Sequence, residues 1–568
     1  MRTVKSLLLG GAAGLLAVAA AQAADLPVKA KPVEYVKVCT LYGEGFFYIP
    51  GTDTCIKVGG WVRWDQYFGN TGGSGNPFVS GSTGRNDSFD SADYQTRGRT
   101  VVSFDVRTQT EYGVLQSYYR GGFELTTNFV SQGEYYLERA FIRFAGFIFG
   151  RTQSYFDTWA QTWSYGGHAY LGAGASTVGA GRNLMAYTAT LGNGVSWTVA
   201  AEDATSRRGA LWDAGTNAMA IGAFPGPNTW TGVGADSCAF GSVTSDQNIG
   251  NAAAPLSVSG ACATGDYAAQ SIPDIVGQLR VDQAWGSAQV SGALHQVRGN
   301  FYGNDTQSTI IAGPNAFTGT RPGDVWGWAV AGGIVLNLPW NPGDKFWVEG
   351  AVGEGTPCYV GICQDDGRNG TYTRFDGGRV AAGWGLDGVF ANAVSANAAS
   401  PAAGGASNFT GIILPTVWDV AAAVEHYWTP ALRTSLFGSV TSWDPGAAGN
   451  AIMCASPNGP VRAGPNGNVT ANGVVLAPGA NNQFSNGAFG GCDYKFELFA
   501  VGSRTVWNPV KNLDVGVEVM WSQIHQNMDP SKVAFNFGGG GNRAAGLYAP
   551  SDENIVSGLV RIQRNFWP

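Results

Sequence analysis

The chain has 568 residues and a formal net charge of −7, and only 13% of its residues are charged. The acidic balance argues against a nucleic-acid partner, because binding to phosphates depends on a surplus of lysine and arginine. A soluble chain of this length usually divides into domains, yet no charged or proline-rich linker divides this one. A large barrel avoids that division, because its interior needs no single packed core.

The N-terminus predicts export. Arg2 and Lys5 precede an apolar run from Leu7 to Ala21, which ends at the small-residue site Ala21-Gln22-Ala23. This order is typical of a cleavable secretory signal; an apolar run of roughly 15 residues is short of the ~20 that a membrane-spanning helix needs. We therefore expect a signal peptide over 1–23 and a mature chain over 24–568. No second apolar run of spanning length follows, so an integral membrane role requires strands.

In chain order, the alternation of apolar and polar residues predicts sixteen strands. They lie at 56–68, 97–110, 114–126, 135–145, 147–153, 182–191, 195–203, 272–283, 287–298, 325–338, 345–354, 416–427, 431–443, 494–507, 512–524 and 553–566.

The connections between these strands alternate in length. Every second one is tight, as at Tyr112-Gly113 and Ala145-Gly146, and the others are long, above all 204–271, 355–415 and 444–493. Outer-membrane barrels have short periplasmic turns and long extracellular loops. A β-sandwich has no reason to separate loop lengths in this way, and a solenoid would show a fixed repeat. The pattern predicts an all-β fold, a transmembrane antiparallel barrel of sixteen strands.

The two faces of single strands agree with this prediction. Val515, Val517 and Val519 share one face of their strand, whereas Asp514 and Glu518 share the other. Polar side chains on the inward face indicate a wet interior.

Eight cysteines fall into local pairs. An even count with near spacing in an exported protein favours disulfides that staple loops, whereas a zinc site would need histidines close by. The sequence alone does not determine the connectivity. The expected disulfide cysteines, pair by pair, are Cys39 and Cys55, Cys238 and Cys262, Cys358 and Cys363, and Cys454 and Cys492.

Three stretches resemble the alphaproteobacterial outer-membrane porins. PVEYVKVC (32–39) followed by FFYIPGTDTCIKVGGWVRWD (46–65) is similar to the N-terminus of that family. RAFIRFAGFIFGRTQSYFD (139–157) resembles its passage into the third external loop, and VRIQRNF (560–566) resembles its closing strand.

The resemblance implies a trimer of sixteen-stranded barrels, each with its own water-filled pore. It also implies that the third loop, about Ser154 to Gly181, folds inward and narrows the channel. The implied location is the bacterial outer membrane, and the implied partners are its lipid, the barrel-insertion machinery, two further copies of the chain and small hydrophilic solutes. The presumed constriction loop departs from the family pattern, because its negative charge is chiefly Asp157.

A pore performs no bond chemistry, so its lining carries the function. The parity of the early strands places several arginines inward, where they would form a basic wall opposite the third loop and set a transverse field. Alternatively, the arginines only pair with Asp105, Glu124 and Asp65 to satisfy a polar lumen. The residues expected at the constriction are Arg63, Arg99, Arg107, Arg120, Arg139, Arg143 and Asp157.

These features favour a passive porin for small hydrophilic solutes and ions, without catalytic residues, metal or cofactor. One alternative is a barrel enzyme such as a lipase or protease, which needs a nucleophile or acid beside a histidine near one rim. The four histidines, which are scattered, show no such spacing. Another alternative, a loop-based adhesin or receptor, is compatible with a pore.

Overall fold

The computed structural model describes residues 37–69, 94–126, 134–158, 164–165, 181–213, 267–268, 271–299, 321–362, 370–390, 410–455, 461–462, 469–471, 474–476, 491–537 and 546–566. The expected signal peptide, 1–23, lies outside these residues. Within them, no helix is both long and apolar enough to cross a membrane.

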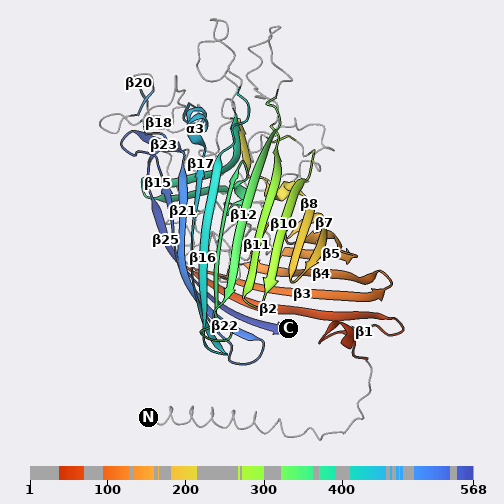
Figure 1. Ribbon diagram of the computed structural model, residues 1–568. Coiled ribbons are helices and arrows are strands. Elements are labelled where there is room, and N and C mark those ends of the chain that lie inside the picture. Colours follow the sequence, from red (N-terminus) through yellow and green to blue (C-terminus); the bar gives the residue numbers. More distant parts are fainter. Residues whose placement is uncertain are drawn as a thin grey trace, which may run out of the picture.

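Sixteen long strands form one closed antiparallel barrel (Figure 1). Each strand pairs with the next along the chain, and the last strand also pairs with the first, which leaves no free edge. The barrel strands are β2 (Thr54–Phe68), β3 (Tyr94–Thr110), β4 (Gly113–Thr126), β5 (Glu134–Phe144), β6 (Phe147–Thr152), β7 (Arg182–Gly192), β8 (Val195–Glu202), β10 (Asp274–Gln283), β11 (Gly286–Val297), β12 (Val325–Asn337), β13 (Lys345–Glu354), β16 (Thr416–Thr429), β17 (Leu432–Asp444), β21 (Phe496–Trp507), β22 (Leu513–Gln526) and β25 (Glu553–Phe566).

The structure confirms all sixteen predicted strands, with ends that differ by a few residues. The seam pairs β2 with β25 from Gly60 opposite Phe566 to Phe68 opposite Gly558. The closing strand therefore lies between β22 and β2. A two-residue strand, β1 (Phe47–Tyr48), extends the sheet beside β2.

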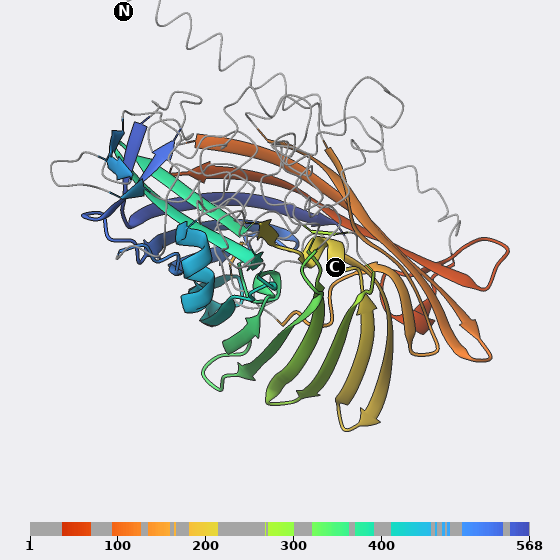
Figure 2. The ribbon, with the colours of Figure 1, turned by 90° about the horizontal axis from the view of Figure 1, so that it is seen from above.

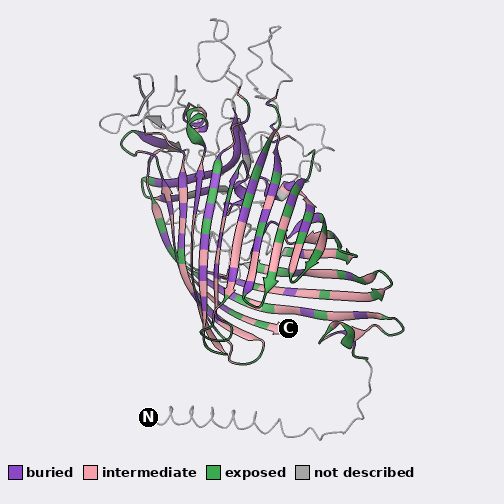
Figure 3. Cartoon of the chain, in the orientation of Figure 1, coloured by how far each residue is buried: buried purple, intermediate pink, exposed green. Residues whose placement is uncertain are grey.

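The two faces of the barrel differ as the period of two requires. On β22, Val517 and Val519 are about half exposed at 48% and 52%, while Glu518 between them is 1% exposed. The same alternation of green and purple bands runs along many of the strands in Figure 3. Outward apolar side chains suit contact with lipid, so polar inward side chains are left to define the lumen.

The long connections contribute a second sheet that the sequence analysis did not predict. Its six strands are β9 (Ala210–Asp213), β14 (Gly370–Asp376), β15 (Arg379–Phe390), β18 (Val461–Arg462), β23 (Val533–Phe537) and β24 (Gly546–Pro550). Strands β14 and β15 form a hairpin, and β15 pairs in parallel with both β9 and β24. The second sheet thus joins connections that are far apart in the sequence.

The hairpin β14–β15 packs against the inner face of the barrel. The Trp443 indole N–H on β17 donates to the Leu386 carbonyl at 3.0 Å, and the Gln526 amide on β22 donates to the Val380 carbonyl at 2.8 Å. Tyr372 and Trp384 of the hairpin belong to the largest buried apolar cluster. Figure 2 shows the teal strands of the hairpin crossing the space that the barrel strands enclose. Part of the lumen is therefore filled by protein.

Smaller elements complete the loops. They are α3 (Gly446–Ala455), the 3-10 turns η1 (Thr40–Tyr42), η4 (Ala204–Arg207) and η8 (Pro357–Tyr359), and the small hairpin of β19 (Val469–Ala471) and β20 (Val474–Leu476).

Two of the expected disulfides are confirmed, Cys39–Cys55 and Cys454–Cys492. The first fastens the segment before β1 to the start of β2, and the second fastens α3 to the connection that leads into β21. Cys358 is also disulfide-bonded. Its expected partner Cys363, together with Cys238 and Cys262, lies outside the described residues.

Candidate functional site

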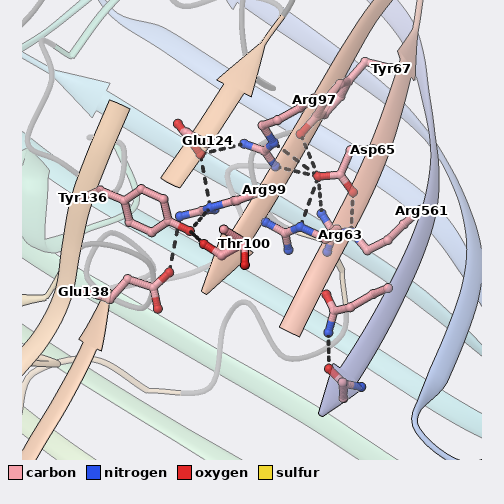
Figure 4. A network of polar contacts seen from close by, with 12 residues as sticks. Arg63, Asp65, Tyr67, Arg97, Arg99, Thr100, Glu124, Tyr136, Glu138 and Arg561 are labelled. Atoms are coloured by element: carbon pink, nitrogen blue, oxygen red, sulfur yellow. Dashed lines mark hydrogen bonds and ion pairs between the residues drawn. The ribbon is translucent and has the colours of Figure 1, made fainter. Parts of the chain in front are cut away.

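The inward side chains of β2, β3, β4 and β5, together with Arg561 of β25, form what we call the charged wall. Where β2, β3 and β25 meet, the Asp65 carboxylate is fully buried between three guanidinium groups (Figure 4). The closest N–O distances are 2.6 Å to Arg561, 2.8 Å to Arg97 and 3.3 Å to Arg63. These charge-assisted bonds connect the closing strand to the first two barrel strands, so the seam is joined by side chains as well as by backbone.

A second group of charges continues the wall onto β4 and β5. Arg99 lies 3.1 Å from Glu124 and 3.3 Å from Glu138, and its Nε donates to the Tyr136 hydroxyl at 2.6 Å. Arg120 shares the same Glu138 carboxylate at 2.5 Å. Figure 4 shows Arg99, Glu124 and Glu138 beside the Asp65 group, and Arg97 lies 3.9 Å from Glu124. The two groups therefore form one continuous network of alternating charge.

A β-bulge places Glu138 in this network. Arg120 pairs with Arg139 across the strands, whereas the next residue, Gly121, pairs with Leu137, so Glu138 is the extra residue. A bulge of this kind redirects a side chain that strict alternation would send to the other face. As a result Glu138 reaches Arg99 and Arg120 inside the barrel.

The structure brings some of the predicted constriction residues together and separates others. Arg63, Arg99 and Arg120 belong to the network just described, and Arg139 lies opposite Arg120. Arg107 pairs with Asp105 at 2.7 Å, further along β3. Arg143, near the turn after β5, is exposed beside the Phe141 ring. The alternative named three carboxylates as partners of the arginines, and each of them has one: Asp65 pairs with Arg63, Glu124 with Arg99, and Asp105 with Arg107.

Asp157, the predicted acid of the third loop, forms its ion pair with Arg207, and Arg139 of β5 lies within electrostatic range of it. Asp157 is buried against Arg207, which follows β8 and contacts it through a hydrogen-bonded ion pair. Burial raises the pKa of Asp157 to about 7, and the Arg207 guanidinium acts against this rise. Asp157 therefore fastens the start of the third loop to the connection after β8.

The third loop contacts two separate parts of the barrel. At its start, side chains of Gln278, Gln289 and Ser291 on β10 and β11 donate to the carbonyls of Tyr155, Asp157 and Phe156, respectively. Further along, the Tyr165 N–H donates to the Glu518 carboxylate of β22 at 2.7 Å. Because β10 and β11 are not neighbours of β22 in the barrel, the described residues of the loop contact the inner surface at two separate places.

Sequence reasoning missed several residues of the site. Arg97 shares the parity of Arg99, and Arg561 lies on the polar face of the closing strand, so a stricter use of period two would have included both. Glu138 carried no such signal, because the bulge breaks the parity of β5. The contact of Tyr165 with β22 joins residues that are more than three hundred positions apart, and no local pattern indicates it.

The inner surface on the other side of β25 is more deeply buried. We call the inward face of β13, β16, β17, β21 and β22 the packed wall. Trp347, Ala421 and Met520 on this wall are each at most 1% exposed. On the charged wall the side chains of Glu124, Arg107 and Arg120 retain 27%, 31% and 38% exposure. Solvent therefore reaches one side of the lumen far more than the other.

Three described histidines lie beside a carboxylate: His426 and His525 are partly exposed, and His295 is fully buried. His295 on β11 lies 2.8 Å from Asp274 through Nδ1 and 3.7 Å from Asp387 of β15 through Nε2, and all three side chains are fully buried. Tyr359 donates to the same Asp274 at 2.6 Å. In the described ranges, no cluster of three or more His, Cys, Asp or Glu side chains is placed to hold a metal ion. The His295 group connects the hairpin β14–β15 to the barrel.

Known proteins agree with this geometry. A family model described as the porin subfamily matches residues 25–559. Porin Omp2a of Brucella melitensis biotype 1 is 36% identical over 225 residues, which cover 35% of this chain and 56% of that porin. Porin Omp2b of Brucella suis is 34% identical over 216 residues, 35% of this chain and 52% of that porin. The chain thus spans about half the length of the curated relatives it matches.

A solved structure supports the fold. The outer membrane channel DcaP of Acinetobacter baumannii superposes with a TM-score of 0.50 at 14% identity, covering 91% of this chain and 99% of that one. At this identity the likeness concerns the barrel architecture alone. The family match over nearly the whole chain carries the assignment: the chain belongs to the porin subfamily, proteins of the bacterial outer membrane.

Proposed function

We propose that the protein is a passive channel through which small hydrophilic solutes and ions diffuse across the outer membrane. The observation that carries this proposal is the charged wall, whose arginines and carboxylates keep solvent exposure inside a barrel with an apolar outer face. A polar lining with fixed charges favours hydrated solutes over apolar ones.

The solute route follows the charged wall in this proposal. The packed wall is covered, in part by the hairpin β14–β15, so the free cross-section is displaced toward β2 to β5. Along that side three arginines share Asp65, and Arg99 and Arg120 share Glu138. Because guanidinium groups outnumber carboxylates there, we expect small anions to pass more readily than cations of equal size.

We further propose that three copies associate, each with its own pore, as the family resemblance implied. The outward apolar side chains would contact lipid and neighbouring copies, and the barrel-insertion machinery would assemble the strands. Cross-linking of the native membrane tests this part: a band at three times the monomer mass is expected, and a monomer band alone would contradict it.

The function itself is tested in a planar lipid bilayer under a salt gradient. We expect stepwise ohmic conductance and a reversal potential whose sign reports preference for chloride over potassium. No current from correctly folded protein would disprove the channel, and a cation preference would disprove the role of the arginines. A matched control removes a positive charge outside the lumen, Lys511→Gln in the turn before β22, and should leave the reversal potential unchanged.

A further inference from the structure

The hairpin β14–β15 extends across the lumen at the rim of the barrel that carries the long connections. Strand β15 contacts barrel strands that are not neighbours: its Asp387 carboxylate lies 3.7 Å from His295 of β11, and its Val380 carbonyl accepts from Gln526 of β22. The five strands β12, β13, β16, β17 and β21 lie between β11 and β22 in the barrel. The hairpin therefore divides the lumen at this rim into two parts (Figure 2).

The hairpin lies directly on the inner surface between these two contacts. A Cβ atom at Gly383 of β15 would lie 2.6 to 2.8 Å from three ring carbons of Phe496 on β21, so only glycine lets the hairpin approach this ring so closely. The Tyr372 ring of β14 is 5.6 Å from the same Phe496 ring, centroid to centroid. Trp443, which donates to the Leu386 carbonyl, is paired with Phe496 across β17 and β21. Protein contact thus excludes water between the hairpin and this part of the barrel.

A buried carboxylate lies on the packed wall beside the contacts of the hairpin. Asp419 of β16 is 1% exposed, and its carboxylate forms no hydrogen bond with another side chain among the described residues. Val417, two residues away on the same face, and Ala351, directly opposite Asp419 on β13, belong to the apolar cluster that contains the hairpin. Glu349, on the same face of β13, is also buried, at 2% exposure. The cluster therefore covers these acidic side chains on the side of the rim.

The charge of this covered surface is opposite to that of the solute route. Arginines are in excess on the charged wall, whereas Asp419 and Glu349 would attract cations if water and ions reached them, because hydration favours the ionised carboxylate. All the strands of the charged wall lie on one side of the hairpin, and β13 and β16 lie on the other.

We propose that the hairpin β14–β15 sets the ion preference of the channel by separating the acidic side chains of the packed wall from the solute route along the charged wall. The proposal rests on the proposed channel function. The hairpin also leaves only part of the lumen open, so its displacement would both widen the route and expose the covered carboxylates.

Two variants displace the hairpin in different ways. Replacement of residues 370–390 by a short glycine-serine linker removes it, and Gly383→Leu keeps it but places a side chain where the Phe496 ring lies. Both should raise single-channel conductance and move the reversal potential toward cation preference, and the deletion should have the larger effect. Truncation of Leu386 to alanine leaves a void rather than an overlap, so the hairpin should then stay in place.

Asp419→Asn tests why the ion preference changes. In the otherwise unmodified chain, this substitution should leave the reversal potential unchanged, because the hairpin already covers the carboxylate. In the hairpin-deleted chain, it should cancel part of the shift toward cations and keep the raised conductance. Such dependence of one change on another is expected only if the hairpin and Asp419 act on the same property.

A matched control separates displacement of the hairpin from general damage. Gly98→Leu adds the same side chain on β3, where a Cβ atom would have nothing within 4 Å, and should keep both conductance and ion preference. The heat-dependent electrophoretic mobility typical of folded barrels identifies any variant that fails to assemble. If the deletion fails to assemble, Gly383→Leu in the full chain carries the test.

The outcomes distinguish this inference from the proposed function. If the unmodified protein conducts and the assembled hairpin variants keep its ion preference, the inference is wrong; it is also wrong if Asp419→Asn alone changes that preference. If the unmodified protein is silent, the channel is disproved, and labelling of Asp419→Cys by a membrane-impermeant thiol reagent still tests the separation. Labelling should be faster when Gly383→Leu is also present; equal rates would overturn the separation as well.

Discussion

The charged wall and the packed wall have the same strand geometry but differ in the charge and solvent exposure of their inward side chains. On the charged wall, inward side chains are long, charged and partly exposed, and neighbouring strands satisfy one another through shared carboxylates such as Asp65 and Glu138. On the packed wall, inward side chains are more deeply buried; apolar residues such as Trp347 lie among enclosed ionisable groups such as Asp419 and Glu518, and the hairpin β14–β15 covers part of the wall. One side therefore resembles a pore lining, and the other is largely closed to solvent.

A wide barrel can contain a narrow solute path when protein fills part of its lumen. A sixteen-stranded barrel encloses more space than a small-solute pore needs. Here long connections return into that space and bury apolar surface against one half of the wall, which excludes water at that side. The charges of the other half then act in a smaller cross-section, where fixed charge affects permeating ions more strongly.

The largest effect on stability is expected at the centre of the charged wall. Asp65→Asn removes the negative charge that three buried guanidinium groups share, and breaking a buried pair in this way costs about 3–5 kcal/mol. Urea unfolding in lipid vesicles, followed by tryptophan fluorescence, measures the loss. Asp529→Asn, in the exposed turn before β23, is the control and should cost far less. Equal losses of unfolding free energy in the two variants would show that the ion pairs of Asp65 do not stabilise the barrel more than those of Asp529.

A slightly smaller loss is expected on the packed side. Leu386 of β15 is 2% exposed within the apolar cluster, so Leu386→Ala should lower the free energy of unfolding by about 3 kcal/mol. Because Leu386 belongs to the packing and not to the route, ion preference should stay unchanged. Leu41→Ala, at a position 61% exposed, serves as the matched control. A shift in ion selectivity in Leu386→Ala would contradict the claim that Leu386 contributes to packing and not to the solute route.

The smallest change in stability should accompany a clear change in permeation. The Arg120 side chain is 38% exposed, and its partner Glu138, which is 5% exposed, still pairs with Arg99 in Arg120→Gln, so the free energy of unfolding should fall by no more than about 1 kcal/mol. It removes a positive charge from the proposed route and should move the reversal potential toward cation preference. An unaltered reversal potential would place the route elsewhere.

How much the sequence could predict depends on the range of the signal. The barrel strands were predictable because alternation and tight turns are local properties, and the closing strand Glu553–Phe566 shows both an alternating pattern and the expected pairing with β2. The inward arginines followed from the same parity, including Arg97 and Arg561, which a stricter count would have added.

The second sheet was not predictable in this way. Strand β15 is buried along nearly its whole length, so both of its faces are small or apolar and the period of two disappears. Its partners β9 and β24 are distant in sequence and parallel to it, so no tight turn in the sequence indicates that these strands pair. The bulge at Glu138 and the contact of Tyr165 with Glu518 leave no local pattern in the sequence, since each depends on another segment of the chain.

The central claim, that solutes pass along the charged wall, is tested most directly by thiol accessibility during conduction. Arg120→Cys places a thiol on the charged wall, and Ala421→Cys places one on the packed wall, at a position 1% exposed. A charged, membrane-impermeant thiol reagent should reduce the current through Arg120→Cys and leave the current through Ala421→Cys unchanged. Equal reduction in both variants, or reduction in Ala421→Cys alone, would contradict the account.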